Sequence, residues 1–280
     1  MPDDTAMPMT ITEMHDHVGA EIGNVDLTRP LNNAEFALVE KAFYEKSVLV
    51  FRGQNLSPEN HIAFSRRFGP LEVHILHQYQ LTDHSEVLQL SNKTDLEGNP
   101  IGLVDAGRYW HTDVSFTETP SMGSFLYAVE VPPKGGDTLF SSQFAAYDAL
   151  PEYWKVRLEN LTALHGLNKT TAPKFTDAQL ASVKGVEHPL IRTHPKTGRK
   201  ALYAGVFVDK VLNVSDAESH EILNYLRSHW ARDEFIYRHR WQVGDLVMWD
   251  NRSILHHATS FKPQYARHMH RTTVEGERPI

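Results

Sequence analysis

Hydrophobic positions in the first third of the chain change from a helical to an extended pattern. Residues 34–46 carry apolar side chains three and four positions apart, which is typical of one face of a helix. These side chains are Phe36, Val39, Ala42 and Phe43. Residues 47–51 (SVLVF) then form an unbroken apolar run, which is typical of a strand buried on both faces. The pattern predicts a helix that leads directly into a core strand.

Two further helices are indicated by signals at their ends. Ser57 and Pro58 match a helix cap followed by proline in the first turn, and Gly69 is placed to end that helix. Ser215 and Glu218 match a capping box ahead of a second amphipathic segment. The apolar face of that segment consists of Ile222, Leu223, Leu226 and Trp230. We expect both helices to lie at the periphery of the fold.

Most of the remaining chain consists of short runs of β-branched and aromatic residues, separated by turn signals such as GGD at 135–137. The predicted strands are residues 86–91, 108–116, 123–131, 138–142, 190–194, 200–204, 234–241, 245–250 and 267–274. Many strands with a few outer helices predict a mainly β fold with flanking α, built on a double-stranded β-helix (jelly roll) core. An immunoglobulin-like sandwich is the alternative from pattern alone, but such domains are shorter and lack long helices.

The length of the chain predicts one domain. A chain of 280 residues with 41% hydrophobic residues can bury one large core, so we expect a single domain over residues 1–280. Residues 1–10 are polar and are expected to form a flexible tail. Polar, glycine-containing stretches at 72–107 and 166–186 are candidate lid segments over a site.

Composition and charge exclude several classes of protein. The chain has no cysteine, so any metal must be bound by His, Asp or Glu. A formal net charge of −7 repels phosphates, so nucleic-acid binding is not expected. Charged residues interrupt every apolar run before it reaches the roughly 18 to 20 residues of a membrane span. The N-terminus carries no targeting pattern, and we expect a cytoplasmic protein with no membrane partner.

The segment Trp110 to Val114 (WHTDV) contains the first candidate for chemistry. Its β-branched and aromatic residues predict a strand, so His111 and Asp113 should project from the same face. They supply two of the three ligands in the two-His, one-carboxylate arrangement that leaves positions open on Fe(II). A lone His-x-Asp is weak evidence in a chain with 17 histidines and 35 acidic residues, and a third ligand must come from elsewhere.

A second cluster lies nearer the C-terminus. Residues 245–257 (DLVMWDNRSILHH) predict two strands around a polar corner, and strand alternation lets only one of His256 and His257 face the interior. The pattern does not decide which. In residues 267–271 (RHMHR), alternation puts Arg267 and Arg271 on one face. Two guanidiniums that face a protein interior need anionic partners, and their shape suits carboxylates.

The motifs now form a recognisable set. WHTD at 110–113, GGDT at 135–138, WDNR followed by a histidine at 249–256 and RHMHR at 267–271 resemble the family of taurine dioxygenase and 2,4-dichlorophenoxyacetate dioxygenase. The resemblance covers nearly the whole chain. It implies a jelly roll with Fe(II) held by His111, Asp113 and His256, with 2-oxoglutarate and O2 as cosubstrates. It implies no catalytic residue beyond the metal ligands.

The same resemblance assigns binding roles. Thr138 and Arg267 would hold the distal carboxylate of 2-oxoglutarate, with Trp241 nearby. The positions that would contact the substrate are Arg271, His74, His77 and Val114. Because Arg271 matches the residue that grips an acidic group in the family, the expected partner is a small anionic substrate, a carboxylate or a sulfonate. The expected reaction is its hydroxylation, with 2-oxoglutarate converted to succinate and CO2.

Some features leave alternatives open. Gly107 stands where taurine dioxygenase has an asparagine, and residues 72–80 do not match the lysine-bearing loop of the phenoxyacetate enzymes, so the acid is not identified. From the residues alone, Thr138 is an ordinary strand threonine and Trp241 a core aromatic residue. A non-redox cupin-like metal enzyme (hydrolase or isomerase) and a non-catalytic jelly-roll binding module are the alternative functions. Relatives are commonly homo-oligomers, and we expect a homo-oligomer here.

Overall fold

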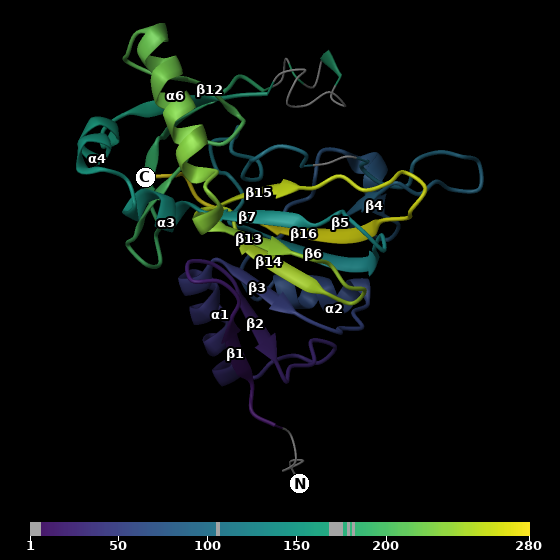
Figure 1. Cartoon of the computed structure of the whole chain (residues 1–280). Coiled ribbons are helices and arrows are strands. Elements are labelled where there is room, and N and C mark those ends of the chain that lie inside the picture. The colour runs from purple at the N-terminus through teal and green to yellow at the C-terminus, as the bar shows by residue number, and fades with distance from the viewer. Residues whose placement is uncertain (1–6, 105–106, 168–175, 178–179, 181–182) are drawn as a thin grey trace.

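The computed structural model describes residues 7–104, 107–167, 176–177, 180 and 183–280. Within these residues, eight strands form one large sheet that crosses the middle of Figure 1. Its order is β1 (Thr10–Glu13), β2 (Ala20–Gly23), β3 (Val48–Phe51), β14 (Leu246–Asp250), β6 (Gly123–Glu130), β16 (His268–Val274), β5 (His84–Ser91) and β4 (Gln80–Leu81). Neighbours pair antiparallel except β2 and β3.

A smaller antiparallel sheet lies against the large one (Figure 1). It consists of β13 (Ile236–His239), β7 (Thr138–Ser142) and β15 (Ile254–Ala258), in that order. Phe140 of β7 is fully buried and contacts Trp249 of β14, with ring centroids 5.5 Å apart. Since β14 leads into β15 through residues 251–253, the chain passes from one sheet to the other at this corner. The predicted mainly β fold with a jelly-roll core is confirmed.

Two helices cover the outer face of the large sheet: α1 (Asn33–Lys46) and α2 (Pro58–Ser65). α1 begins with a capping box, because Asn32 accepts from the Glu35 backbone and the Glu35 carboxylate accepts from the Asn32 N–H. Phe43 of α1 and Phe64 of α2 pack at Phe125 in the large sheet, with centroids 6.3 and 6.1 Å away. The predicted helix at 34–46 is therefore confirmed within one residue.

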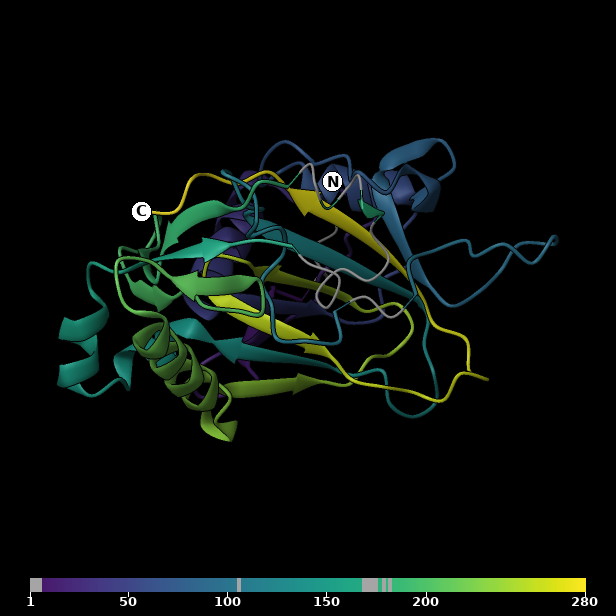
Figure 2. The same ribbon diagram turned by 90° about the horizontal axis from the view of Figure 1, so that it is seen from above.

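In the described part of the chain, the other side of the molecule carries three helices and two small sheets (Figures 1 and 2). The helices are α3 (Gln143–Asp148), α4 (Glu152–Leu158) and α6 (Asp216–Trp230). The small sheets are β12 (Val208–Val211) with β8 (Thr162–His165) and β9 (Val186–Pro189), and β10 (Ile191–Thr193) with β11 (Lys200–Leu202). Single 3-10 turns are η1 (His77–Tyr79) and η2 (Asp233–Phe235). α6 buries Ile222, Leu226 and Trp230, as expected from its amphipathic pattern.

Two predictions about local structure are wrong. Residues 108–116 do not form a strand: only His111 makes an isolated bridge, and the chain turns at 113–116, with Val114 at φ 58°. The helix predicted to reach Gly69 ends at Ser65, since Arg67 and Phe68 donate to carbonyls only three residues back and tighten into a turn. At His111 a bridge to the distant His256 replaces the predicted strand, whereas at the end of α2 the change is a local tightening of the last turn.

The candidate lid at 72–107 contains β5, which pairs with β16 in the large sheet and buries Val87 completely. Residues 84–91 are thus sheet, in agreement with the strand predicted at 86–91, while the flanks at 72–83 and 92–104 are mostly irregular, and a lid formed by these flanks stays a prediction. Much of the second candidate, 166–186, lies outside the described residues, as do 1–6 of the predicted tail.

Among the helices that the structure describes, none is long and apolar enough to cross a bilayer.

Candidate active site

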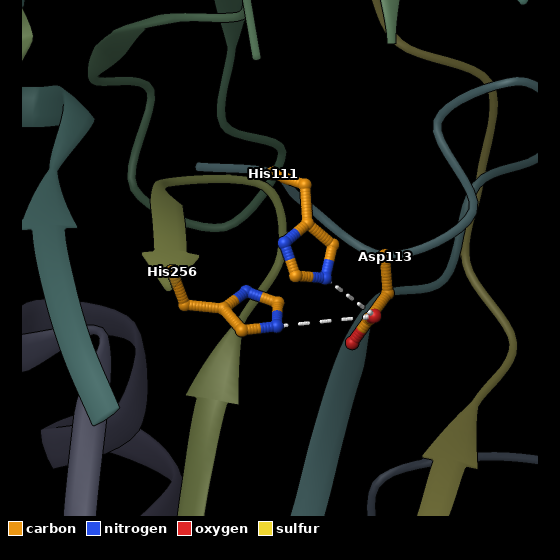
Figure 3. Close-up of side chains that lie close together, drawn as sticks. All are labelled: His111, Asp113 and His256. Atoms are coloured by element: carbon orange, nitrogen blue, oxygen red, sulfur yellow. Dashed lines mark ion pairs between the residues drawn. The ribbon is translucent and has the colours of Figure 1, made fainter. Parts of the chain in front are cut away.

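Three side chains converge between the two sheets (Figure 3). Nε2 of His111 lies 3.6 Å and Nε2 of His256 lies 3.9 Å from Oδ1 of Asp113. Their potential ligand atoms all lie within 4.8 Å of one another. In the described part of the chain, no other group of three or more His, Asp or Glu residues meets this criterion. All three are buried. Two imidazole nitrogens and one carboxylate oxygen are the donor set that suits Fe(II) with open coordination positions.

The two histidines are held together by their backbones. His111 donates its N–H to the carbonyl of His256 at 3.1 Å, and His256 returns the bond at 2.8 Å. The ring centroids lie 4.0 Å apart. Nδ1 of His111 is 2.8 Å from the Tyr109 carbonyl, so that bond fixes the ring with Nε2 toward Asp113. The bridge replaces the strand that the sequence predicts here.

Strand β15 decides between the adjacent histidines. The His256 ring lies between Trp249 and Phe140 in the interior, at centroid distances of 4.7 and 6.3 Å. His257 points the other way and contacts Trp110 at 5.6 Å. The structure therefore brings His256 to the converging group and leaves His257 outside it.

Asp113 is oriented by three polar neighbours. Ser124 of β6 donates to Oδ2 at 2.6 Å, and the Asp113 N–H lies 3.3 Å from the side-chain oxygen of Asn251. The same Asn251 accepts from Trp249 Nε1 at 3.0 Å. With Oδ2 engaged, Oδ1 is the oxygen that faces the two histidines and the Nη1 of Arg271, 3.2 Å away. Ser124 was not foreseen, since a serine within an apolar run gives no signal of its own. Asn251 belongs to the predicted polar corner, but its bond to Asp113 was not predicted.

A pair of buried histidines supports the turn that follows Asp113. His165 of β8 hydrogen bonds through Nδ1 to the Ser115 hydroxyl at 3.1 Å, and His188 of β9 hydrogen bonds through Nε2 to the Thr117 carbonyl at 2.9 Å. The two rings lie 5.1 Å apart. These contacts tie the sheet of β12, β8 and β9 to the segment that carries Asp113.

Electrostatics keep the group in the protonation states that a metal needs. Burial alone would raise the pKa of Asp113, but Arg271 and then the two imidazoles outweigh it and hold the pKa well below its usual range. Burial, followed by the proximity of His111, lowers the pKa of His256 well below its ordinary value. The site thus presents a carboxylate and a neutral imidazole at neutral pH.

A pocket opens from this group toward two arginines, one just before β16 and one on it. Its lining residues are Leu90, Gly107, His111, Leu126, Thr138, Trp249, His256, Ala258, Arg267 and Arg271. Burial and the nearby Arg108 lower the pKa of Arg267 to about 10. In the described part of the chain, no carboxylate forms an ion pair with Arg267. Thr138 accepts a hydrogen bond from Trp241 Nε1 at 3.0 Å, which places Trp241 at the edge of the same pocket.

The four residues expected to contact the substrate do not all lie near the pocket. Arg271 lines the pocket, and the pKa of His74 is lowered to about 4 by burial and then by Arg271, so His74 lies within its electrostatic reach. Val114 follows Asp113 with a positive φ in the turn. His77, by contrast, is exposed on η1, where its Nδ1 lies 2.9 Å from Gln80. The structure brings the first three toward the metal-binding group and leaves His77 at the surface.

Comparison with known proteins agrees with this geometry. A family model described as "Taurine catabolism dioxygenase TauD, TfdA family" matches residues 10–273. The chain belongs to the TauD/TfdA family. It is 38% identical to the alpha-ketoglutarate-dependent 2,4-dichlorophenoxyacetate dioxygenase of Cupriavidus pinatubonensis, over 95% of this chain and 98% of that protein. It is 31% identical to the alpha-ketoglutarate-dependent sulfate ester dioxygenase of Pseudomonas putida, over 98% and 92%.

Solved structures of the TauD/TfdA type agree as well. AAD-2 in complex with Mn(II) and N-oxalylglycine is similar with a TM-score of 0.84 at 32% identity, covering 98% of this chain and 99% of that one. A taurine dioxygenase from Burkholderia xenovorans gives 0.84 at 33%, covering 97% and 91%. The predicted resemblance and the class of 2-oxoglutarate-dependent dioxygenase, an oxidoreductase, are confirmed. The cupin-like hydrolase and the binding module are correspondingly disfavoured.

Proposed function

We propose that this protein is an Fe(II)- and 2-oxoglutarate-dependent dioxygenase that hydroxylates a small carboxylate, sulfonate or sulfate ester. The observation that carries the proposal is the shared pocket. A two-His, one-carboxylate group lies at one side, and two partly buried arginines lie at the other. Oxygen activation needs the first, and a dicarboxylate cosubstrate with an anionic substrate explains the second.

The metal ligands in this proposal are His111 and His256 through Nε2 and Asp113 through Oδ1. These are the atoms that face one another, and three protein ligands leave the remaining positions of an octahedral ion open. When bound, the iron supplies the activation of O2 and the oxidative decarboxylation of 2-oxoglutarate to succinate and CO2. The chain itself holds the ligands in place, excludes water and orients both organic molecules.

Thr138 and Arg267 would bind the distal carboxylate of 2-oxoglutarate. Arg267 is partly buried without an acidic partner in the described chain, and Thr138 lines the same pocket with its hydroxyl fixed by Trp241. The relative AAD-2 was solved with Mn(II) and N-oxalylglycine, which has the skeleton of 2-oxoglutarate with one methylene replaced by NH. A guanidinium and a hydroxyl together match the fork of a carboxylate.

Arg271 would bind the acidic group of the substrate. One of its amino groups contacts Asp113, but its buried Nε has no hydrogen-bond partner in the described structure and can donate to an anion. His74, which interacts electrostatically with Arg271 and Asp113, and the backbone of Val114, next to Asp113 in the chain, would complete the contact. His77 would reach the substrate only if η1 moved inward. Named relatives act on phenoxyacetates and on sulfate esters, so carboxylates and sulfur oxyanions are the classes to test.

The test is oxygen uptake together with succinate formation, measured across sulfonates, aryloxyalkanoates, sulfate esters and amino acids. We expect turnover that requires both Fe(II) and 2-oxoglutarate and an anionic substrate. Replacing Asp113 by alanine should abolish succinate formation, whereas Asp233→Ala, at an exposed position in η2, should not. Normal turnover by the Asp113 variant would refute the iron site. Activity with cationic or neutral compounds alone would refute the role of Arg271.

The proposal extends to the oligomeric state of the protein and to its location in the cell. A homo-oligomer is the expectation carried from the family resemblance, and light scattering coupled to gel filtration tests it. A cytoplasmic location is likewise an expectation, tested by fractionation of cells that express the full chain.

A further inference from the structure

Two histidines on β16 face away from the pocket. Met269 and Arg271 point into the space between the sheets, so alternation puts His268 and His270 on the outer face of the large sheet. Their Nε2 atoms lie only 3.1 Å apart, and the rings are nearly perpendicular at 82°. Both side chains are half-buried. Neither belongs to the converging group of His111, Asp113 and His256.

The distance between the two Nε2 atoms suits a shared metal ion. Metal-to-imidazole bonds of about 2.0–2.1 Å that meet at tetrahedral or right angles separate the two nitrogens by roughly 2.8–3.4 Å. The observed 3.1 Å falls inside this interval. A direct hydrogen bond gives a similar distance but requires the rings to be opposite tautomers, one donating and one accepting.

The surroundings favour two neutral imidazoles. Burial is the main cause that lowers the pKa of His270 to about 4, and His268 adds to it. Burial and then Lys93 lower the pKa of His268, while Glu130 opposes them. Both rings therefore keep free lone pairs at neutral pH, as metal binding requires. Glu130, which pairs in register with His268, supplies a negative charge beside the pair, although Lys93 engages it at 2.7 Å.

We propose that His268 and His270 form a second metal site, on the outer face of β16, for a late first-row divalent ion such as Zn²⁺ or Cu²⁺. Imidazole ligands favour these ions, and water fills the remaining positions. The two histidines chelate only when the strand is formed, since alternation brings them to one face. The ion therefore stabilises the strand that carries Arg271. The site is independent of the proposed function.

The direct experiment is calorimetric titration of the full-length, metal-stripped protein with Zn²⁺ alone. We expect two binding sites in the wild type. His268→Gln/His270→Gln should lose one and His111→Ala/His256→Ala the other. His220→Gln, at an exposed position of α6, is the matched control and should keep both. The proposal is overturned if the His268/His270 variant binds Zn²⁺ with the stoichiometry and affinity of the wild type.

A second measurement guards against variants that merely fold badly. Zn²⁺ that binds the folded strand raises the melting temperature by mass action. In the His111→Ala/His256→Ala protein, this rise should persist and should vanish when His268 and His270 are also replaced. Each single variant, His268→Asn or His270→Asn, should weaken binding at least roughly tenfold, since even loss of an outer-shell partner costs that much. An equal rise in melting temperature with and without the pair would overturn the proposal.

Discussion

Two regions of the molecule each bury an arginine, and they treat its charge in opposite ways. At the corner between β14 and β15, Arg252 donates from Nε and Nη2 to Asp250, at 2.8 and 2.7 Å. Burial is more than offset by that carboxylate, and the pKa of Arg252 is raised. Just before β16, Arg267 is half-buried, but burial and then Arg108 lower its pKa to about 10.

The difference separates architecture from binding. At the corner between β14 and β15, each charged side chain has partners within the protein. Oδ2 of Asp250 also lies 2.9 Å from Nε2 of His194, and Nη1 of Arg252 lies 3.7 Å from Oε2 of Glu277. Arg267 has no such acid within the described chain, and a buried unpaired cation is costly. An unpaired cation of this kind is expected where a ligand supplies the missing anion. Arg252 is therefore expected to govern stability, and Arg267 affinity for a cosubstrate.

The largest effect should come from breaking the corner. Replacing Arg252 by methionine leaves the Asp250 carboxylate buried without its main partner, which should lower the free energy of unfolding by about 3–5 kcal/mol. Urea denaturation followed by fluorescence measures the change. Arg238→Met, which removes a half-exposed partner of Asp137, is the control and should cost less than about 1 kcal/mol. Equal losses in the two variants would contradict the comparison.

The next largest effect should come from Arg267→Leu. Binding of 2-oxoglutarate should weaken by roughly 30-fold or more, the lower end of the ~2–5 kcal/mol cost of truncating one side of a buried charge pair. Because the variant removes an uncompensated buried charge, its stability without ligand should be unchanged or higher. Calorimetry and denaturation on the same preparation test both statements. A destabilised apo protein would show that Arg267 has a structural partner.

A smaller and more selective effect is expected for Arg271. Arg271→Leu should raise the KM for the anionic substrate by about tenfold or more, consistent with loss of a charge-assisted bond of roughly 1.5–3 kcal/mol. The affinity for 2-oxoglutarate should change much less. Steady-state kinetics with each reactant varied in turn distinguishes the two, and Arg271→Lys, which keeps the charge, should recover part of the loss. A change confined to 2-oxoglutarate would reassign this arginine.

The smallest effect concerns Thr138. Thr138→Val removes the hydroxyl that accepts from Trp241 and, in our proposal, donates to the cosubstrate. Loss of one neutral hydrogen bond should weaken 2-oxoglutarate binding about fivefold, or ~1 kcal/mol. Thr138→Ser, which keeps the hydroxyl, is the matched control and should bind nearly as well as the wild type. If both variants bound 2-oxoglutarate with the same affinity, Thr138 would be an ordinary strand residue with no part in cosubstrate binding.

Sequence patterns predicted elements whose signals are local. The helix at 34–46 was found because apolar spacing sets its face, although the capping residues Asn32 and Glu35 were not noticed. The strands β1 and β2 were missed. β1 is exposed throughout and carries no core-facing pattern, whereas β2 buries Ala20 and Ile22 but has only four residues. The order of strands in the large sheet depends on pairings between residues far apart in sequence, such as β3 with β14, which periodicity does not report.

The candidate site shows the same limit. His111 and Asp113 were predicted together from strand alternation, but an isolated bridge to His256 and a turn bring them together instead. The resemblance selected His256, and the structure gives a reason, because only that ring enters the interior beside Trp249. Ser124, which lies 11 residues from its partner Asp113, could not be inferred, because its hydrogen bond exists only after the sheets form.

The central claim is that the metal-binding group and Arg267 are two ends of one pocket for a single dicarboxylate. Anaerobic calorimetry of the wild-type protein with 2-oxoglutarate, in the presence and absence of Fe(II), tests it most directly. We expect one equivalent to bind, far more tightly with Fe(II), and the metal-dependent gain to disappear in Asp113→Ala. Affinity that is the same with and without Fe(II), or no binding in either condition, would contradict the account.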